Sequence, residues 1–456
     1  MPSISQSIGG ARLEDLQREF WGTVTDLTNC LAAGHRLIAE SWFRRHAGAA
    51  PSTANQDAQA LPFQRWYKVK EAFAPRAVVD AIASLKARPC TCIDPFGGSG
   101  TTALTCQFLG VRPTTIEVNP FLADLIEAKL ARYEMTGLMA DYRAVVDAAG
   151  TLQADPVSMM ANAPTTFIEP GVDERWIFSM EVASRILALR AAIEALPNRR
   201  HLVLFRVLLG SLLITCSNVV INGKGRRYRS GWESRRVTGS DIMRAFEAAF
   251  LAAIEDICRY GNRPCSDYTL LRRDAREAVA ESARCDFALF SPPYPNSFDY
   301  TDIYNVELWM LGYLKTRADN LGLREATLRS HVQIKRSYSA NVHSPQLREV
   351  VDRLAEKRER LWDREIPEMI MAYFDDLRIV LSGLYRIMPG GASVMMVVGD
   401  SRYAEVTINV GAIATEVAAS EGFQLVGSSP IRSMRSSAQQ GGRFDLDETL
   451  VHLTRE

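Results

Sequence analysis

The stretch DPFGGSGTT, residues 94–102, decides the fold. It follows a short apolar run, CTCID (90–94), and precedes a helical pattern over 101–109. Glycines at such a junction allow a sharp turn and let the backbone approach a ligand without Cβ atoms in the way. A second apolar run, PTTIEVN (113–119), and a helical pattern over 121–133 come next. The order of strand, glycine turn, helix, strand and helix predicts a doubly wound parallel α/β sheet.

Two acidic residues flank the glycine turn. Asp94 stands directly before it, and Glu117 ends the second predicted strand, seventeen residues after Gly100. A carboxylate at that place can accept hydrogen bonds from both ribose hydroxyls of a nucleoside cofactor. The turn lacks the Gly-Lys-Ser/Thr ending of a P-loop, which argues against nucleotide hydrolysis. The alternative is a plain tight turn that binds no ligand.

The stretch DPFGGSGTT resembles motif I, the cofactor-binding motif of S-adenosylmethionine-dependent DNA amino-methyltransferases. The resemblance implies a Rossmann-like class I methyltransferase sheet with S-adenosyl-L-methionine as the cofactor. RWYKVKEAF (65–73) is similar to motif X, and RRDARE (272–277) is similar to motif III, whose acid contacts the cofactor's adenine. Without the family, Tyr67 reads as a core aromatic and Asp274 as a helix cap. The cofactor-binding residues implied by the resemblance are Tyr67, Lys68, Phe73, Asp94, Phe96, Gly97, Gly98, Gly100, Thr101, Glu117 and Asp274.

The tetrapeptide Ser291-Pro292-Pro293-Tyr294 follows the apolar run DFALF (286–290). It stands at the carboxyl end of a predicted strand, where a doubly wound sheet presents its ligand groups, and it resembles the catalytic motif IV of the same family. An exocyclic amine becomes nucleophilic when acceptors bind its N–H groups, and the Ser291 side chain and the Pro292 carbonyl can supply them. Tyr294 can stack on a base that has left its helix. A Pro-Pro turn without function is the alternative.

These resemblances imply methyl transfer from S-adenosyl-L-methionine to an exocyclic amine of DNA, by direct displacement on a flipped-out base. In the family the serine form of the tetrapeptide occurs mostly in enzymes that make N4-methylcytosine, so cytosine N4 is favoured over adenine N6. RNA methylation and a catalytically silent DNA-binding subunit are the alternatives. The implied partners are double-stranded DNA and a separate restriction endonuclease or defence-system subunit.

Four units are predicted along the chain. A helical stripe over 11–46 and a small, polar linker over 47–60 make an N-terminal extension. Long helical patterns then interrupt the strands, which indicates a helical insertion between the second and third strands. The predicted units are an N-terminal helical extension with its linker (1–60), a cofactor-binding half (61–150), a helical insertion with a role in target recognition (151–265) and a catalytic half (266–456).

A basic, glycine-containing stretch, NGKGRRYRSGWESRR (222–236), lies between the two halves. Basic side chains bind phosphates and aromatic ones stack or wedge between bases, so we expect a mobile DNA-binding loop here. A solvated surface loop is the alternative, and a second polar loop, RSMRSSAQQGGRF (432–444), is a lesser candidate through Arg432, Arg435 and Arg443. The DNA-binding residues predicted in the first loop are Lys224, Arg226, Arg227, Arg229, Trp232, Arg235 and Arg236.

Composition narrows the class of protein. The 456 residues hold 53 Lys and Arg and 53 Asp and Glu, so nucleic-acid binding must come from a local basic patch. The eight cysteines form no CxxC pair, and no histidine pair has metal-ligand spacing, so no disulfide framework and no metal are expected. No apolar run reaches the roughly 18 residues of a membrane span, and no signal peptide is evident. We expect a cytoplasmic enzyme.

Overall fold

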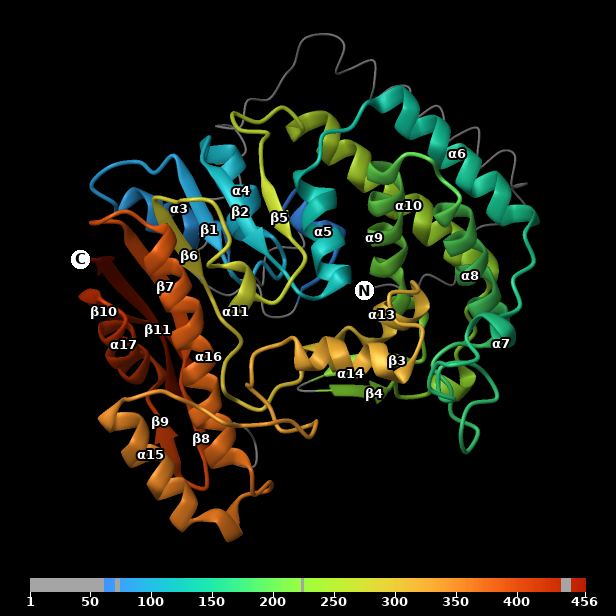
Figure 1. Cartoon of the computed structure of the whole chain (residues 1–456). Coiled ribbons are helices and arrows are strands. Elements are labelled where there is room, and N and C mark those ends of the chain that lie inside the picture. The colour runs from blue at the N-terminus through green and yellow to red at the C-terminus, as the bar shows by residue number, and fades with distance from the viewer. Residues whose placement is uncertain (1–60, 70–73, 223–224, 436–443) are drawn as a thin grey trace.

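The computed structural model describes residues 61–69, 74–222, 225–435 and 444–456 (Figure 1). The helix predicted over 11–46 and the linker predicted over 47–60 lie outside these residues.

A seven-stranded sheet forms the centre of the molecule. Its strands run in the order β10-β11-β7-β6-β1-β2-β5, and those from β7 to β5 are parallel, whereas β11 is antiparallel to both of its neighbours. This confirms the predicted doubly wound α/β fold, with its reversal of strand order between β1 and β6. The strands are β1 (Thr91–Asp94), β2 (Arg112–Ile116), β5 (Thr269–Leu271), β6 (Phe287–Phe290), β7 (Ser393–Gly399), β10 (Phe423–Arg435) and β11 (Phe444–Arg455).

Both faces of the sheet are covered by helices, as the period-two alternation of strand side chains requires. Cys92 and Phe287 pack on one face with helices α3 and α4, while Ile93 and Ala288 pack on the other with α16 and α17. The helices of this α/β part are α3 (Pro75–Ala83), α4 (Thr101–Leu109), α5 (Pro120–Leu130), α11 (Ala275–Ala278), α15 (Pro345–Glu356), α16 (Ile366–Ile387) and α17 (Val410–Ser420), with the 3-10 helix η5 (Arg358–Arg360).

A layer of long helices stands beyond the β5 edge of the sheet (Figure 1). These helices share a core with α5, with the 3-10 helix η3 (Gln64–Trp66) and with residues 298–314. Helix α6, which the sequence analysis placed in the cofactor-binding half, packs against α8 of this layer. The long helices of this layer are α6 (Met135–Thr151), α8 (Met180–Glu194), α9 (Arg199–Cys216) and α10 (Gly239–Tyr260). The shorter helices outside the α/β part are α7 (Pro156–Met159), α12 (Tyr300–Ile303), α13 (Asn305–Met310) and α14 (Arg317–Glu325).

Two stretches that were expected to be loops contain strands. Within 222–236, residues Gly225–Tyr228 form β4, which pairs with β3 (Val219–Asn222) as an antiparallel hairpin, and Trp232–Ser234 form the 3-10 helix η4. Within 432–444, the first four residues belong to β10 and residues 436–443 lie outside the described part. A further small hairpin, β8 (Ser401–Tyr403) with β9 (Val406–Ile408), follows β7. None of the described helices is long and apolar enough to cross a membrane.

Candidate functional site

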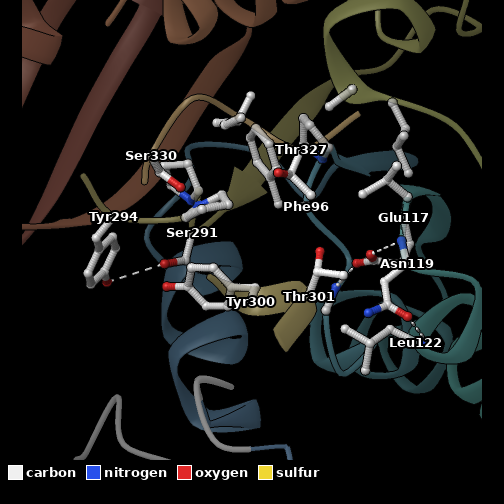
Figure 2. A pocket seen from close by; sticks show the side chains of 18 of the residues that line it. Phe96, Glu117, Asn119, Leu122, Ser291, Tyr294, Tyr300, Thr301, Thr327 and Ser330 are labelled. Atoms are coloured by element: carbon white, nitrogen blue, oxygen red, sulfur yellow. Dashed lines mark hydrogen bonds between the residues drawn. The ribbon is translucent and has the colours of Figure 1, made fainter. Parts of the chain in front are cut away.

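A cavity of about 480 Å³ opens at the carboxyl ends of the parallel strands (Figure 2). It spans the point between β1 and β6 where the strand order reverses, which is the usual ligand site of an open α/β sheet. The glycine loop lines one part of it and the tetrapeptide another, although the two lie almost 200 residues apart in the chain. The predicted residues on its wall are Lys68, Phe96, Gly98, Glu117, Asp274, Ser291, Pro292, Pro293 and Tyr294.

The glycine loop turns tightly against β2. Gly98 and Gly100 have φ angles of 49° and 75°, in the left-handed region that favours glycine. The Gly97 amide donates to the carbonyl of Ile116 at 2.9 Å, which fixes the loop to the neighbouring strand. Helix α4 then begins at Thr101, behind the loop. Gly97, Gly100 and Thr101 therefore shape the loop without lining the cavity.

The two predicted acids lie at the ends of β1 and β2. Glu117 is buried, and its carboxylate accepts from the amides of Gly98 at 2.7 Å and Asn119 at 2.8 Å (Figure 2). Burial raises the pKa of Glu117 to about 7, against the opposite effect of these hydrogen bonds. Asp94 is also buried and accepts from the Phe96 amide at 2.9 Å, and burial raises its pKa to about 6. Asp94 holds the loop through the Phe96 amide and does not line the cavity, whereas Glu117 lines it.

A buried lysine holds the glycine loop from α5, and the sequence analysis did not single it out. Lys129 donates to the Ser99 carbonyl at 2.7 Å and to Gln64 Oε1 at 3.0 Å. Its side chain is fully buried, which lowers its pKa to about 7. Lys129 thereby joins the loop to η3, the segment that precedes it in the chain.

The segment before the glycine loop is fixed mainly to the helical layer. Asp256 of α10 is 1% exposed and accepts from the Phe63 amide at 2.8 Å and from Trp66 Nε1 at 2.9 Å. Of the residues predicted here from motif X, Lys68 lines the cavity. The Tyr67 hydroxyl instead donates to Glu307 at 2.8 Å, away from the cavity wall. Phe73 lies outside the described residues.

The predicted adenine contact, Asp274, has a structural role and also lines the cavity. Its carboxylate caps α11 by accepting from the Arg276 amide at 2.9 Å, and it binds the Arg276 guanidinium. The helix-capping alternative from the sequence is therefore present in the structure. The residue also lies on the cavity wall, and its contact with the cofactor stays a prediction.

The tetrapeptide presents its polar atoms to the other part of the cavity (Figure 2). The Ser291 hydroxyl donates to the Val397 carbonyl at 3.0 Å and lies 3.3 Å from the Tyr294 oxygen. The Tyr294 hydroxyl donates to Glu448 Oε1 at 2.9 Å, and Arg432 binds the same carboxylate. Sequence reasoning missed Glu448 and other wall residues: Asn119, Leu122, Thr301, Tyr304, Thr327, Ser330 and His331.

The described members of the DNA-binding set predicted in the first loop are on or beside the β3–β4 hairpin, and none of them lines the cavity. Arg229 donates to the carbonyls of Ile214 and Ser217 at the end of α9, and Arg235 donates to the carbonyl of Thr215 there. The Arg226 guanidinium lies over the Phe167 ring, and its Nη2 is 3.6 Å from Asp302 Oδ1. Trp232 is buried, whereas Arg227 and Arg236 are exposed. Lys224 lies outside the described residues.

Known proteins of similar sequence span most of the chain. Type II methyltransferase M.AvaI, from Nostoc sp. (strain PCC 7120 / SAG 25.82 / UTEX 2576) and from Anabaena variabilis, is 26% identical over 410 residues, or 80% of each chain. Type II methyltransferase M.BsoBI of Geobacillus stearothermophilus is 23% identical over 434 residues, which cover 83% of this chain and 82% of that protein. The chain is homologous to Type II methyltransferases. This confirms the resemblance to DNA amino-methyltransferases that the motifs predicted.

Two further comparisons add little. No family model matches the chain. Among solved structures, the rRNA methyltransferase aviRa from Streptomyces viridochromogenes aligns with 84% of this chain and 85% of its own at 11% identity, but with a TM-score of 0.27. A TM-score this low does not indicate a shared fold, so the fold assignment rests on the strand order of the sheet. Among the described residues, no group of three or more His, Cys, Asp or Glu side chains is arranged to hold a metal ion.

Proposed function

We propose that the protein transfers a methyl group from S-adenosyl-L-methionine to an exocyclic amine of a base in double-stranded DNA, with cytosine N4 favoured over adenine N6. The observation that carries the proposal is the single cavity that unites the glycine loop and Glu117 with the tetrapeptide 291–294. The homology to Type II methyltransferases supports the same reaction class. When bound, S-adenosyl-L-methionine supplies an activated methyl group.

The residues at the glycine loop fit the nucleoside part of that cofactor. Glu117 uses one lone pair on each carboxylate oxygen for backbone amides, and a carboxylate can accept about four hydrogen bonds. It therefore has capacity left for two ribose hydroxyls. Phe96 and Leu122 add apolar wall for an adenine, and the volume is within the usual 300–1,000 Å³ range of small-molecule sites.

The tetrapeptide then orients the amine that receives the methyl group. Because the Ser291 hydroxyl donates its proton to Val397, its lone pairs stay available to accept an amine N–H. The Pro292 carbonyl can accept the second N–H, which draws the nitrogen toward a tetrahedral, nucleophilic geometry. S-adenosyl-L-methionine held beside Glu117 and the glycine loop would supply the methyl group for direct displacement, with S-adenosyl-L-homocysteine as the leaving group and the amine proton released to water. No covalent bond between enzyme and base is needed.

The target base reaches the tetrapeptide only outside its helix, so the mechanism requires base flipping. Stacking on an aromatic side chain is worth roughly 1–3 kcal/mol per base, which offsets part of the unstacking cost. Tyr294 is the aromatic of the tetrapeptide, and Tyr300 also lines the cavity (Figure 2). We assign the stacking role to Tyr294. The exposed Arg227 and Arg236 are proposed to bind backbone phosphates.

The test is methyl transfer from labelled cofactor to mixed-sequence duplex DNA and to total RNA, followed by mass spectrometry of the nucleosides. We expect N4-methylcytosine in the DNA, a weaker rate in Ser291→Ala and a still weaker one in Tyr294→Ala. Ser420→Ala, at the end of α17, is the matched control. N6-methyladenine would correct the base, and label in RNA alone would correct the substrate. Bound cofactor without transfer to either would leave a silent subunit, and wild-type rates in both variants would overturn the site.

The remaining parts of the proposal concern the cell. A separate restriction endonuclease or defence-system subunit and a cytoplasmic location stay predictions. Co-purification of the tagged protein from its native host, with nuclease assays on the eluate, tests the first. Fractionation of the same cells tests the second.

A further inference from the structure

Glu448 is an acidic side chain on the catalytic part of the cavity wall that the proposed reaction has not used. It belongs to β11 and is 4% exposed. Its carboxylate accepts the Tyr294 hydroxyl at 2.9 Å. It also accepts from Arg432 on β10, through Nε at 2.6 Å and Nη2 at 3.0 Å. A carboxylate with charge-assisted hydrogen bonds of this kind is held firmly in one orientation.

The hairpin of β10 and β11 explains why these groups meet. Arg432 and Glu448 are directly opposite each other in the strand register, so their side chains leave the same face of the sheet. Glu448 is also opposite Gly399 of β7, and this places it beside the tetrapeptide at the end of β6. The chain Arg432–Glu448–Tyr294–Ser291 therefore runs from the sheet edge to the serine that faces the amine.

A tyrosine ring on a short loop can otherwise turn about two side-chain bonds. The Tyr294 hydroxyl is the end of the ring farthest from the backbone, so an anchor there fixes both torsions. The anchor is ionic on one side and buried, which strengthens a hydrogen bond relative to one in water. A ring that is already in place also loses less entropy when a base stacks on it.

We propose that Glu448 is a positioning residue that fixes the Tyr294 ring as the stacking wall for the flipped-out base, with Arg432 holding the carboxylate in place. The inference rests on the proposed function and adds a positioning element from the last two strands of the sheet. Glu448 acts through Tyr294 and touches neither the methyl group nor the amine.

A double-variant cycle tests the link. Glu448→Gln keeps the shape but removes the charge, and Tyr294→Phe keeps the ring but removes the hydroxyl. We expect each variant to lower kcat roughly ten- to a hundredfold, the range of a charge-assisted hydrogen bond, with cofactor affinity unchanged. The double variant should be no slower than the slower single, because both changes act on the same contact. Asp447→Asn, on the exposed neighbour in β11, is the control that keeps the wild-type rate.

Two results would overturn the inference. One is a wild-type kcat in Glu448→Gln, and the other is a double variant whose losses multiply. A general loss of structure would lower the melting temperature and the cofactor affinity together, which separates folding from positioning. Rate measurements alone would not distinguish a failed inference from a failed assignment of the reaction.

A spectroscopic readout makes that distinction. 3-Fluorotyrosine placed at position 294 gives a ¹⁹F resonance that reports the ring's environment without any substrate. We expect one narrow resonance in the parent protein and in Asp447→Asn, and a shifted, averaged one in Glu448→Gln. The same spectrum in Glu448→Gln as in the parent refutes the anchor even if the wild-type protein methylates nothing. A changed spectrum without methyl transfer keeps the anchor and refutes the proposed reaction.

Discussion

The substitution Gly97→Ala tests how the glycine loop is built. A Cβ at this position would stand 2.3 Å from Thr115 Cγ2 and 2.7 Å from Ile126 Cδ1. Carbon atoms in contact are normally about 3.5–4.0 Å apart, so the new methyl group is too close to Thr115 by more than about 1 Å. Both neighbours are buried side chains with little room to move. The loop must therefore retreat from β2.

The retreat has a cost in stability and a separate cost in binding. Overpacking a buried site typically costs about 1–3 kcal/mol, and we expect the upper half of that range because two atoms clash. Each kcal/mol lowers the melting temperature by about 2–4 °C in a domain of about 150–250 residues. The same movement breaks the 2.7 Å bond from Gly98 to Glu117. Losing one such contact should weaken cofactor binding at least tenfold, equivalent to about 1.4 kcal/mol.

The assay combines thermal melting with calorimetric titration of S-adenosyl-L-methionine. Gly98→Ala is the first control: its nearest contact would be Phe96 O at 3.7 Å, so only its φ of 49° costs energy, about 1–2 kcal/mol. Gly150→Ala is the second, because nothing lies within 4 Å and the residue is helical. An unchanged melting temperature and affinity in Gly97→Ala would refute the steric argument.

Three further predictions concern buried polar groups. The Glu117 pKa of about 7 is above its unfolded value of 4.5. The free energy of unfolding should therefore fall by about 3 kcal/mol from this group as pH rises from 4.5 to 7. Denaturant titrations at several pH values should show this fall in the parent protein and not in Glu117→Gln. Asp256 pairs with Arg65 at 2.7 Å, and Glu255 pairs with the same guanidinium at 2.8 Å but is half-buried. Asp256→Asn should therefore cost about 3–5 kcal/mol, as in other broken buried ion pairs, whereas Glu255→Gln should cost under about 1 kcal/mol. Equal melting points of the two variants would contradict this. Lys129→Met leaves the Ser99 carbonyl without its donor, so cofactor affinity should fall in calorimetry, and an unchanged affinity would show that the lysine does not support the loop.

Much of the α/β fold could be predicted because its signals are local. The parallel strands β1, β6 and β7 are short runs that are buried throughout or over all but the first residue, and β6 and β7 are mostly apolar, as is typical of strands covered on both faces. The glycine turn and the tetrapeptide stand at strand ends, and the carboxyl ends of parallel strands meet at one edge. The convergence of residues 94–102 and 291–294 on one cavity follows from that geometry.

The β3–β4 hairpin and the cavity role of Glu448 could not be predicted in the same way. In the hairpin region, Arg229 satisfies the last carbonyls of α9, a contact that depends on how the chain folds back and that composition cannot distinguish from a phosphate contact. Glu448 did carry a signal, because it stands two residues after the buried Leu446 and so shares its face of β11. Its partner Tyr294 is 154 residues away, beyond the reach of any local pattern.

The adjacency of β1 and β6 has a consequence for how the molecule could be divided. The glycine loop and the tetrapeptide 291–294 are carried by stretches on either side of residues 261–268, the connection between α10 and β5. A polypeptide cut in that connection would leave each fragment with half a pocket, and parallel pairing of β1 with β6 would have to rejoin them. Catalysis would then become second order in the two fragments. If each fragment were fused to one of two proteins that bind each other, methylated DNA would record that the two proteins had associated.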